Sequence, residues 1–512
     1  MPVGVELRLY DGASVQTSLT GIQAMWWDVT EPKDGSKPVG KSDAVTTDAS
    51  GDIFLDLSNV TGLTVGDYGF LMLYRLDGTD HEDSLVFAGK IQTSTITSGV
   101  DMYYYDSGWT RPAGWLSLGT PLISTDEKLV GLCKVANHGS NFIAFTCDGA
   151  YTVDWGDGGS PVDYATGVTA EKNFAYSDYA GSEVTHPNGE SYRQALVTIT
   201  PQGGSSLTSI DLNVKHSQSG LGNDTATPWL DISLSGPNLT SLTIGKSDDV
   251  VRHLSLEQCS IVNSGSITDF TYMFYACYSL QSIPLLDTSA GTNFNNMFNA
   301  CYSLQSIPLL DTSAGTNFSR MFNACYSLQS IPLLDTSAGT DFTYMFYGCY
   351  SLQSIPLLDT SAGTNFTYMF YVCRSLQSIP LLNTSAGTDF TYMFYACYSL
   401  QSIPLLDTSA GTDFTYMFYA CYSLQSIPLL DTSAGTNFSN MFNACYSLQI
   451  GAMSGTKETV SYANCKLGPD ELDAIYTNLA TVTAKTITVT GNWGVSGDDP
   501  SIATAKGWTV TG

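Results

Sequence analysis

The sequence DFTYMFYACYSLQSIPLLDTSAGT, residues 269–292, is written eight times with few changes between Asp269 and Leu448. The period is 24 residues, and one cysteine in each copy marks it: Cys277, Cys301, Cys325, Cys349, Cys373, Cys397, Cys421 and Cys445. A fixed period of this size is typical of a solenoid, in which each repeat buries its apolar face only by stacking on its neighbours. We therefore expect the repeats to form one continuous rod.

The first third of each repeat predicts a short helix. Phe270, Met273, Phe274 and Cys277 fall within an arc of about 100° on a helical wheel, which would make a buried stripe. Asp269, which is Asp or Asn in every copy, would cap this helix by accepting hydrogen bonds from the first N–H groups.

The middle of each repeat has the L-x-x-I-x-L spacing of a leucine-rich-repeat strand, with Ile283 and Leu285 expected to point inward. Ser282, Pro284 and Leu286 would then form a concave face, unless the strand ends sooner. Strands stack about 4.8 Å apart whereas helices need about 8–10 Å, so the rod is expected to curve with its strands on the concave side.

The repeat cysteines are interpreted as small buried hydrophobic residues. On the wider helical layer, their Cα atoms would lie more than about 7 Å apart, which is too far for a disulfide. A redox array or a metal site is therefore not expected in the rod.

The positions of Tyr272 and Tyr275 vary together between copies, with Asn or Arg at the first and Asn at the second, whereas the buried Phe, Met and Cys positions do not vary. On the helical wheel the variable positions lie opposite the buried stripe, where tyrosine offers apolar area and hydrogen bonds for carbohydrate or protein recognition. Tyrosines that only shield the helices are an equal alternative. The candidate binding residues are Tyr272, Tyr275, Tyr344, Tyr347, Tyr368, Tyr371, Tyr392, Tyr395, Tyr416, Tyr419, Arg320 and Arg374.

The segments flanking the repeats predict the two ends of the rod. Residues 204–268 carry degenerate L-x-x-L-x-L spacings and are interpreted as the first coils. Residues 449–512 are interpreted as a C-terminal cap, with Leu472, Ile475 and Leu479 at helical spacing and further short elements at 486–490, 501–505 and 508–510.

Residues 1–98 are interpreted as an Ig-like β-sandwich that acts as an attachment domain. Its expected strands are short apolar or alternating runs between turns: Val5–Tyr10, Ile22–Val29, Ile53–Leu57, Gly69–Tyr74 and Ser84–Ile91. Residues 99–122 follow as an aromatic-rich connector.

Residues 123–203 predict a second β-sandwich. The sequence YTVDWGDGG, residues 151–159, resembles PKD-type Ig-like domains, in which a strand ends in a W-G-D-G turn. Asp154 and Asp157 are weak calcium candidates, because carboxylates in a glycine-rich turn more often accept hydrogen bonds from the backbone. No other metal and no cofactor is expected.

The repeat itself resembles the BspA-like leucine-rich repeat surface proteins, through the pattern M-F-x-x-C-x-S-L-x-x-I. The resemblance covers residues 205–512, including a family-like ending at Gly497–Trp508, and implies adhesion and surface binding. The expected fold is mainly β with short helices: N-terminal β-sandwich domains, a curved leucine-rich-repeat solenoid of 24-residue repeats at 269–448, and a small α/β cap.

The composition argues against two classes of partner. With 48 acidic and 20 basic residues the net charge is −28, so a phosphate backbone would be repelled and no nucleic acid is expected. No segment approaches the about 20 apolar residues of a membrane span, so no membrane insertion is expected. The first residues lack the basic and apolar regions of a signal peptide, which predicts synthesis in a cytoplasm without a cleaved leader.

Catalysis is not expected. The five histidines are scattered, and Asp287-Thr288-Ser289, although it resembles an aspartic-protease motif, recurs in turns without a partner. A polysaccharide-degrading enzyme would need paired carboxylates in a groove, whereas the aligned aspartates form only a repeated row.

The order of sandwiches and solenoid resembles modular bacteriophage adhesins. We therefore expect a non-enzymatic virion protein, such as a tail or head fibre, spike or decoration subunit, that is made in the host cytoplasm. It would join other virion proteins through its N-terminal domain and bind host surface carbohydrate or protein through the solenoid, with homo-oligomerisation left open. The alternatives are a BspA-like adhesin on the bacterial cell surface and a polysaccharide-degrading enzyme.

Overall fold

The computed structural model describes residues 111–512 except 138–140, 186–190, 218–224, 247–250 and 284–285, and nine short strands within residues 1–110. The chain divides into two compact units at Arg111.

The N-terminal unit contains antiparallel sheets. One has the strand order β6-β1-β9, another has the order β5-β4-β7-β8, and β2 pairs with β3. All five strands expected here are present, within one or two residues at each end. The bounds are β1 (Val3–Arg8), β2 (Tyr10–Asp11), β3 (Ser14–Val15), β4 (Ile22–Asp28), β5 (Gly40–Lys41), β6 (Asp52–Asp56), β7 (Tyr68–Arg75), β8 (Leu85–Gln92) and β9 (Ser94–Thr95).

The second unit begins with the predicted sandwich. One sheet has the order β13-β12-β16-β10-β19-β22, and the other has the order β14-β11-β17-β20. Its first elements are β10 (Lys128–Ala136), β11 (Phe142–Asp148), β12 (Tyr151–Asp154), β13 (Val162–Tyr164), β14 (Ala170–Asn173), the 3-10 helix η1 (Tyr176–Tyr179), β15 (Val184–Thr185) and β16 (Ser191–Pro201).

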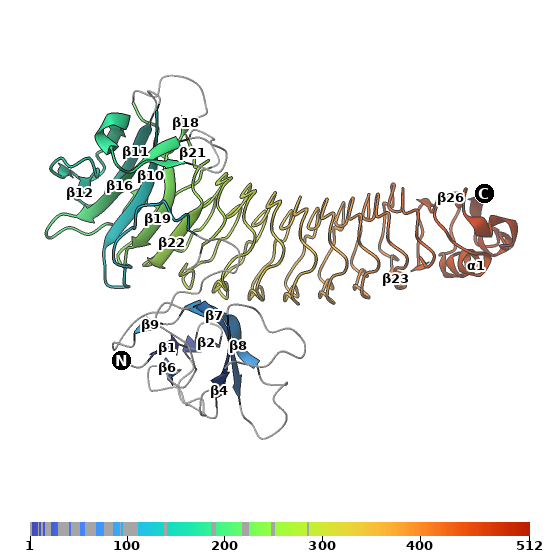
Figure 1. Ribbon diagram of the computed structural model, residues 1–512. Helices are drawn as coiled ribbons and strands as arrows, with labels where there is room; N and C mark the ends of the chain where they lie inside the picture. The colour runs from blue at the N-terminus through green and yellow to red at the C-terminus, as the bar shows by residue number, and fades with distance from the viewer. Residues whose placement is uncertain are drawn as a thin grey trace. The chain divides into compact units, whose positions relative to one another are not determined.

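Both sheets of this sandwich run on into the first coils of the solenoid (Figure 1). On one sheet β10 pairs with β19 antiparallel and β19 pairs with β22 parallel; on the other, β11 pairs with β17 antiparallel and β17 pairs with β20 parallel. The sandwich therefore supplies the paired edge that starts the solenoid. The elements added are β17 (Ser209–Asp211), β18 (Thr225–Ala226), β19 (Trp229–Ser235), β20 (Ser241–Thr243), β21 (Val251–Arg252) and β22 (Gln258–Asn263).

A tryptophan fixes this junction. Trp229 of β19 is fully buried and lies directly over Gly131 of β10, where an added Cβ would come within 2.1 Å of the indole. Trp115 of the connector is also buried and donates its indole N–H to the hydroxyl of Tyr192 at 2.8 Å. The end of the connector is thus packed onto the sandwich.

The expected helix over 270–277 is wrong, because this segment forms a series of tight turns. Tyr272 donates its N–H to the carbonyl of Asn295 in the next coil at 3.1 Å, and Tyr275 donates to the carbonyl of Tyr272 in its own coil at 2.9 Å. Backbone N–H groups alternate between these two kinds of partner, coil after coil. The segment is therefore a parallel hydrogen-bonded ladder between coils.

Left-handed residues produce this alternation. Tyr272 and Ala276 have φ of 59° and 57°, and the same two positions are left-handed in the following copies. A non-glycine residue in this region costs about 1–2 kcal/mol, so the segment persists only because the hydrogen bonds and packing between coils compensate. The buried set was nonetheless predicted correctly, since Phe270 and Cys277 are fully buried.

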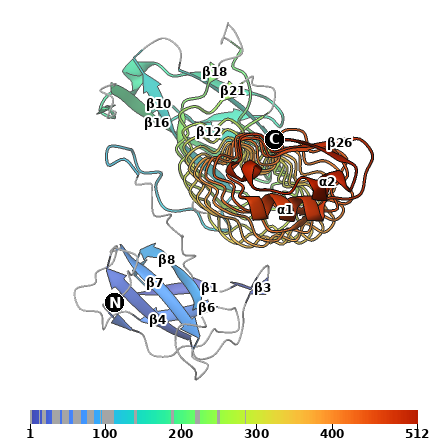
Figure 2. The same cartoon turned by 90° about the vertical axis from the view of Figure 1, so that its right-hand side faces the viewer.

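The spacing between coils is close to that of strands on this side as well. Phe270 stacks on Phe294 with ring centroids 5.5 Å apart, and Phe274 stacks on Phe298 at 5.4 Å. Seen end-on, the coils lie one behind another (Figure 2). The wide helical layer on which the predicted curvature depended is therefore absent.

The cysteines are buried as expected. The wide separation between coils that was predicted to prevent disulfides is not present. Cys301 donates its Sγ–H to the carbonyl of Phe274 in the preceding coil at 3.1 Å, and the same bond recurs through Cys445. All twelve cysteines of the chain are free and buried. The seven repeat thiols from Cys301 to Cys445 are thus each held by a backbone carbonyl, and burial raises the pKa of the Cys301 thiol.

In the middle of the repeat, the prediction of which leucine points inward is wrong. Ile307 and Leu310 are buried, whereas Leu309, at the position of Leu285, is 70% exposed. In the described pairs the first leucine, expected inside, is therefore outside, and the second, expected on the concave face, is inside. Ser282, expected on the same face, is also buried, whereas its counterparts Ser330 and Ser354 are exposed. Pro284 and Leu285 themselves lie outside the described residues.

The C-terminal cap was predicted correctly. The ring of Tyr462 stacks on Phe442 at 4.7 Å and ends the phenylalanine column, while Leu472 and Ile475 bury one face of α1. The parallel sheet β25-β26-β27 closes the end (Figure 1). The bounds are β23 (Leu430–Asp431), β24 (Met453–Ser454), β25 (Val460–Ser461), α1 (Pro469–Asn478), β26 (Lys485–Thr488), η2 (Trp493–Ser496), α2 (Ser501–Thr504) and β27 (Trp508–Thr511).

The left-handed positions give a stability prediction. Ala324→Gly should raise the free energy of unfolding by up to about 1 kcal/mol, because it removes the strain at φ 57° that outweighs the entropy lost by glycine. The chain already has Gly348 at this position in the next coil, with φ 72°. Urea unfolding of the full chain measures the change.

Ala338→Gly is the matched control, since Ala338 is equally half-buried and is not left-handed. This variant should lose about 0.5–1 kcal/mol. Equal destabilisation by both substitutions would contradict the assignment of strain.

Candidate functional site

Eight of the predicted binding residues form one surface, here called the tyrosine platform: Tyr344, Tyr347, Tyr368, Tyr371, Tyr392, Tyr395, Tyr416 and Tyr419. They make two parallel columns across four coils. Ring centroids are 4.4–4.7 Å apart in the Tyr344 column and 4.6–4.7 Å apart in the Tyr347 column. Within a coil, the two rings meet at 5.4–5.6 Å and are tilted or T-shaped.

The turn conformation places both rings outside. Tyr344 is left-handed with φ 58°, and the two residues that follow it, Met345 and Phe346, are fully buried. The next residue, Tyr347, donates its N–H back to the carbonyl of Tyr344 at 3.1 Å, which returns the chain to the surface. Side chains three residues apart therefore meet on the outer face without a helix.

The stacking decides what the platform presents to a ligand. Neighbouring rings in the Tyr347 column are within 3–8° of parallel, so each inner ring has both faces covered by its neighbours. Every ring of the platform is half-buried. The platform therefore exposes ring edges and a regular row of hydroxyl groups, rather than the flat faces expected from the sequence.

The other candidates lie outside the platform. Tyr272 and Tyr275 form a T-shaped pair at 5.4 Å in the first copy, and the next two copies carry Asn or Arg at these positions. The guanidinium of Arg320 lies 4.5 Å from the ring centroid of Tyr344 and covers the outer face at that end of the platform. The structure thus joins Arg320 to the platform and leaves Tyr272 and Tyr275 apart.

A third aromatic column, here called the lateral column, contains the last candidate. Its members are Tyr278, Tyr302, Tyr326, Tyr350, Arg374, Tyr398, Tyr422 and Tyr446. Arg374 takes the place of one ring and lies 4.5 Å from Tyr350 and 5.7 Å from Tyr398. Its planar guanidinium substitutes for a phenol in the stack, which explains how the one exception is tolerated.

Sequence reasoning found these residues but not their stacking. The 24-residue period could have revealed the stacking. If successive coils are spaced like strands, a tyrosine repeated every 24 residues must stack on the equivalent tyrosine of the next coil. The helical assignment hid it, since helices would have kept the rings apart.

Five of the platform hydroxyls have raised pKa values. Burial, followed by the nearby phenols, raises the pKa of Tyr368 and Tyr371 to about 12. Tyr347, Tyr392 and Tyr395 also have raised pKa values, with burial as the main cause. These five hydroxyls therefore stay neutral at physiological pH and can both donate and accept hydrogen bonds.

The two calcium candidates, Asp154 and Asp157, form hydrogen bonds within the turn that contains them. Asp154 accepts the N–H of Gly156 at 2.9 Å, and Asp157 accepts the N–H of Gly159 at 2.9 Å and pairs with Lys172 at 2.6 Å. The hydrogen bond from Lys172 is the main reason that the pKa of Asp157 is lowered. Both carboxylates therefore accept a backbone N–H of their own turn.

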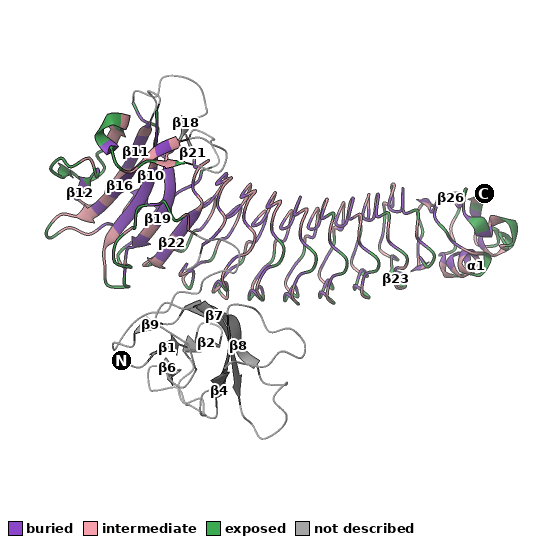
Figure 3. Cartoon of the chain, in the orientation of Figure 1, coloured by how far each residue is buried: buried purple, intermediate pink, exposed green. Residues whose placement is uncertain are grey.

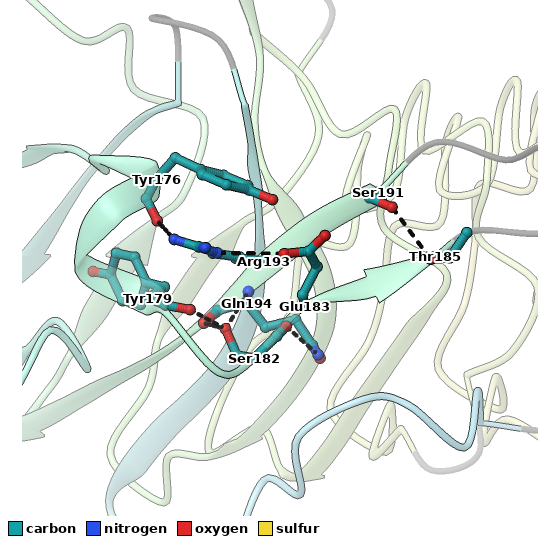
Figure 4. Close-up of polar contacts among 8 residues, drawn as sticks. All are labelled: Tyr176, Tyr179, Ser182, Glu183, Thr185, Ser191, Arg193 and Gln194. Atoms are coloured by element: carbon teal, nitrogen blue, oxygen red, sulfur yellow. Dashed lines mark hydrogen bonds and ion pairs between the residues drawn. The ribbon is translucent and has the colours of Figure 1, made fainter.

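A polar cluster on the sandwich is likewise structural (Figure 4). Arg193 of β16 donates to the carbonyl of Tyr176 at 2.6 Å and lies 4.1 Å from the centroid of that ring. Ser182 accepts the N–H of Gln194 at 3.0 Å. These contacts hold η1 and the following loop against β16.

The aspartates of the repeat turns also bond locally. Asp359 accepts a hydrogen bond from the N–H of Ser361 at 3.0 Å, and hydrogen bonding by Ser361 lowers the pKa of Asp359. Across the part of the chain that the structure describes, no group of three or more His, Cys, Asp or Glu is placed to hold a metal ion. None of the helices described is long and apolar enough to span a bilayer.

The repeats match a known family. Residues 250–357 and 340–454 match the family described as "Mycoplasma protein of unknown function, DUF285", which supports the resemblance of the repeats to BspA-like proteins. No curated protein matches the chain. Among solved structures, the crystal structure of the TLR13–ssRNA13 complex matches at 14% identity and a TM-score of 0.15, covering 56% of this chain and 61% of that chain. A TM-score this low carries no argument about function.

The raised pKa values predict loss of stability in alkali. Unfolded tyrosines ionise near pH 10, whereas Tyr368 and Tyr371 in the fold keep their protons to about pH 12. Their contribution to stability is full below about pH 10 and is lost as the pH rises to about 12. Urea unfolding midpoints measured from pH 8 to 12, with tyrosinate absorbance recorded in parallel, test this expectation.

A variant with Tyr368→Phe and Tyr371→Phe is the control, because phenylalanine keeps the stack and cannot ionise. It should lose less stability above pH 10 than the unsubstituted protein. Ionisation of all 30 tyrosines near pH 10 in the folded protein would contradict the prediction.

Proposed function

We propose that this protein is a non-enzymatic adhesion protein that binds a host surface glycan or protein through its repeat solenoid. The tyrosine platform is the observation that carries the proposal. It gathers eight phenol side chains on one face of four successive coils, and the structure does not use their outer edges for packing within the rod.

The regular spacing favours a repeating ligand. Hydroxyl groups carried on rings 4.4–4.7 Å apart form a row along the solenoid axis. A linear glycan in an extended conformation presents its own hydroxyl groups at a similar repeat, so one sugar unit can meet each coil. Neutral hydroxyls that donate and accept, set among apolar ring edges, suit a sugar better than a charged polymer.

We further propose that the protein is a virion component attached through residues 1–98, as a fibre, spike or decoration subunit. The order of sandwich and solenoid supports this by analogy with phage adhesins. A bacterial cell-surface adhesin is the second candidate, and the match of residues 250–357 and 340–454 to DUF285 favours it.

The binding proposal predicts the effect of removing hydroxyls alone. Replacing Tyr344, Tyr368, Tyr392 and Tyr416 by Phe keeps the stacked column and should weaken binding at least tenfold, because all four hydroxyl groups of one row are lost. Binding is measured on an array of linear polysaccharides and on intact bacterial cells.

Tyr302→Phe and Tyr326→Phe, in coils outside the platform, form the control and should leave binding unchanged. Undiminished binding by the four-fold platform variant, with its circular dichroism unaltered, would overturn the assignment of the platform as the binding surface.

Mass spectrometry of purified virus particles and of bacterial envelopes distinguishes a virion component from a bacterial cell-surface adhesin. The virion proposal expects peptides of this chain in the particles. Their presence in envelopes alone would support the bacterial adhesin instead.

A further inference from the structure

A row of leucines on the repeat solenoid is exposed although the rest of the coil buries its apolar residues. Leu309 is 70% exposed, Leu333, Leu357, Leu381 and Leu405 are each 60% exposed, and Leu429 is 50% exposed. We call this row the leucine ridge. Exposed segments recur at the same place in successive coils (Figure 3).

The ridge is larger than a chance exposure. At the spacing of about 4.8 Å between strands, six leucines extend roughly 24 Å along the axis. The half-buried prolines that precede them, such as Pro332 and Pro356, widen the apolar surface. Monomeric proteins rarely leave a contiguous apolar patch of more than a few hundred Å² uncovered, so the ridge indicates an interface.

Two polar rows flank the ridge. On one side lie exposed glutamines, four residues before each leucine: Gln329, Gln353, Gln377, Gln401 and Gln425. On the other side, two residues after each leucine, lie Asp311, Asp335, Asp359, Asn383, Asp407 and Asp431. The face is therefore neutral on one edge, apolar in the centre and acidic on the other edge.

This asymmetry selects one way of joining two copies. A two-fold axis perpendicular to the rod would set the aspartate row of one copy against that of the other, which places like charges opposite each other. A two-fold axis parallel to the rod sets each aspartate row against the glutamine row of the second copy, where amide N–H groups can donate to carboxylates. Both copies then point in the same direction.

We propose that the leucine ridge is the interface of a parallel homodimer, with the ridge of one copy packed along the ridge of its partner. Identical periods on both surfaces place each leucine opposite its counterpart in the second copy along the whole ridge. The interface is isologous, as is usual for two-fold dimers.

The dimer leaves the tyrosine platform free. In each coil the platform residues, such as Tyr344 and Tyr347, precede the ridge residue Leu357 by 10–13 positions in a 24-residue circuit, which is about half a turn of the coil. A parallel dimer therefore carries its two platforms on opposite outer faces, where each stays accessible to a ligand.

Sedimentation of the full chain at micromolar concentration tests the association. We expect a species of twice the 55.0 kDa chain mass. Leu333→Asp, Leu357→Asp and Leu381→Asp together should give monomers, because these side chains are 60% exposed and the charges can be hydrated in the free chain while they oppose each other in the dimer. Circular dichroism checks that the variant is folded.

Thr340→Asp, Thr364→Asp and Thr388→Asp add the same charge at exposed positions away from the ridge and should leave the dimer intact. Monomeric wild-type protein, or a dimer that survives the three leucine substitutions, would overturn the proposal.

Cysteine crosslinking tests the direction. The native cysteines are all buried, so Leu309→Cys and Leu429→Cys, placed at opposite ends of the ridge, provide the accessible thiols. A parallel dimer crosslinks each variant to itself under mild oxidation and gives no mixed product when the two variants are combined. Mixed products without self-crosslinking would show an antiparallel dimer and overturn the proposed arrangement.

Discussion

The hydrogen bonds between successive coils are the constraint on which the rod depends. In the segment that begins each repeat, every second N–H reaches forward to a carbonyl of the next coil, as Phe274 does to Met297 at 2.8 Å, and the N–H groups between them close tight turns within the coil. This arrangement gives the backbone N–H groups hydrogen-bond partners without a helix. It also fixes a strand-like spacing between successive coils around the whole circuit. It also requires left-handed residues at two positions of the repeat, which the chain fills with tyrosine, asparagine or arginine at the first and with alanine, glycine or valine at the second.

A single spacing turns each repeated side chain into a column. Phenylalanines stack at 5.3–5.9 Å inside the rod, and tyrosines stack at 4.4–4.7 Å on the platform. Polar side chains obey the same rule: the fully buried Thr336 donates its hydroxyl to the carbonyl of Asp359 in the next coil at 2.7 Å. Because every interior residue contacts its own copies, a change of size at one position would alter the fit on both sides, which accounts for the near identity of the repeats.

The same repetition shapes the surface. A residue that points outward does so on every coil, so single tyrosines, leucines and aspartates become long rows of one chemical character. The tyrosine platform and the leucine ridge lie about half a circuit apart, so the proposed ligand site and the proposed dimer interface do not overlap. The solenoid begins at the sandwich, because both sheets of the sandwich continue into strands of the first coils. It ends at the C-terminal cap, where Tyr462 stacks on Phe442.

Much of this fold was determined by the sequence alone. The period of 24 predicted a solenoid, the unvarying Phe, Met and Cys positions predicted its interior, and the spacing of Leu472, Ile475 and Leu479 predicted the helix of the cap, because apolar periodicity reports burial directly. The backbone path was decided only in the tertiary structure. The spacing of Phe270, Met273 and Phe274 fits a helix as well as a pair of turns, and hydrogen bonds to Asn293 and Asn295 of the next coil select the turns. Those bonds join residues that are 23 positions apart, so the local sequence could not reveal that the platform rings stack or which leucine of each pair faces outward.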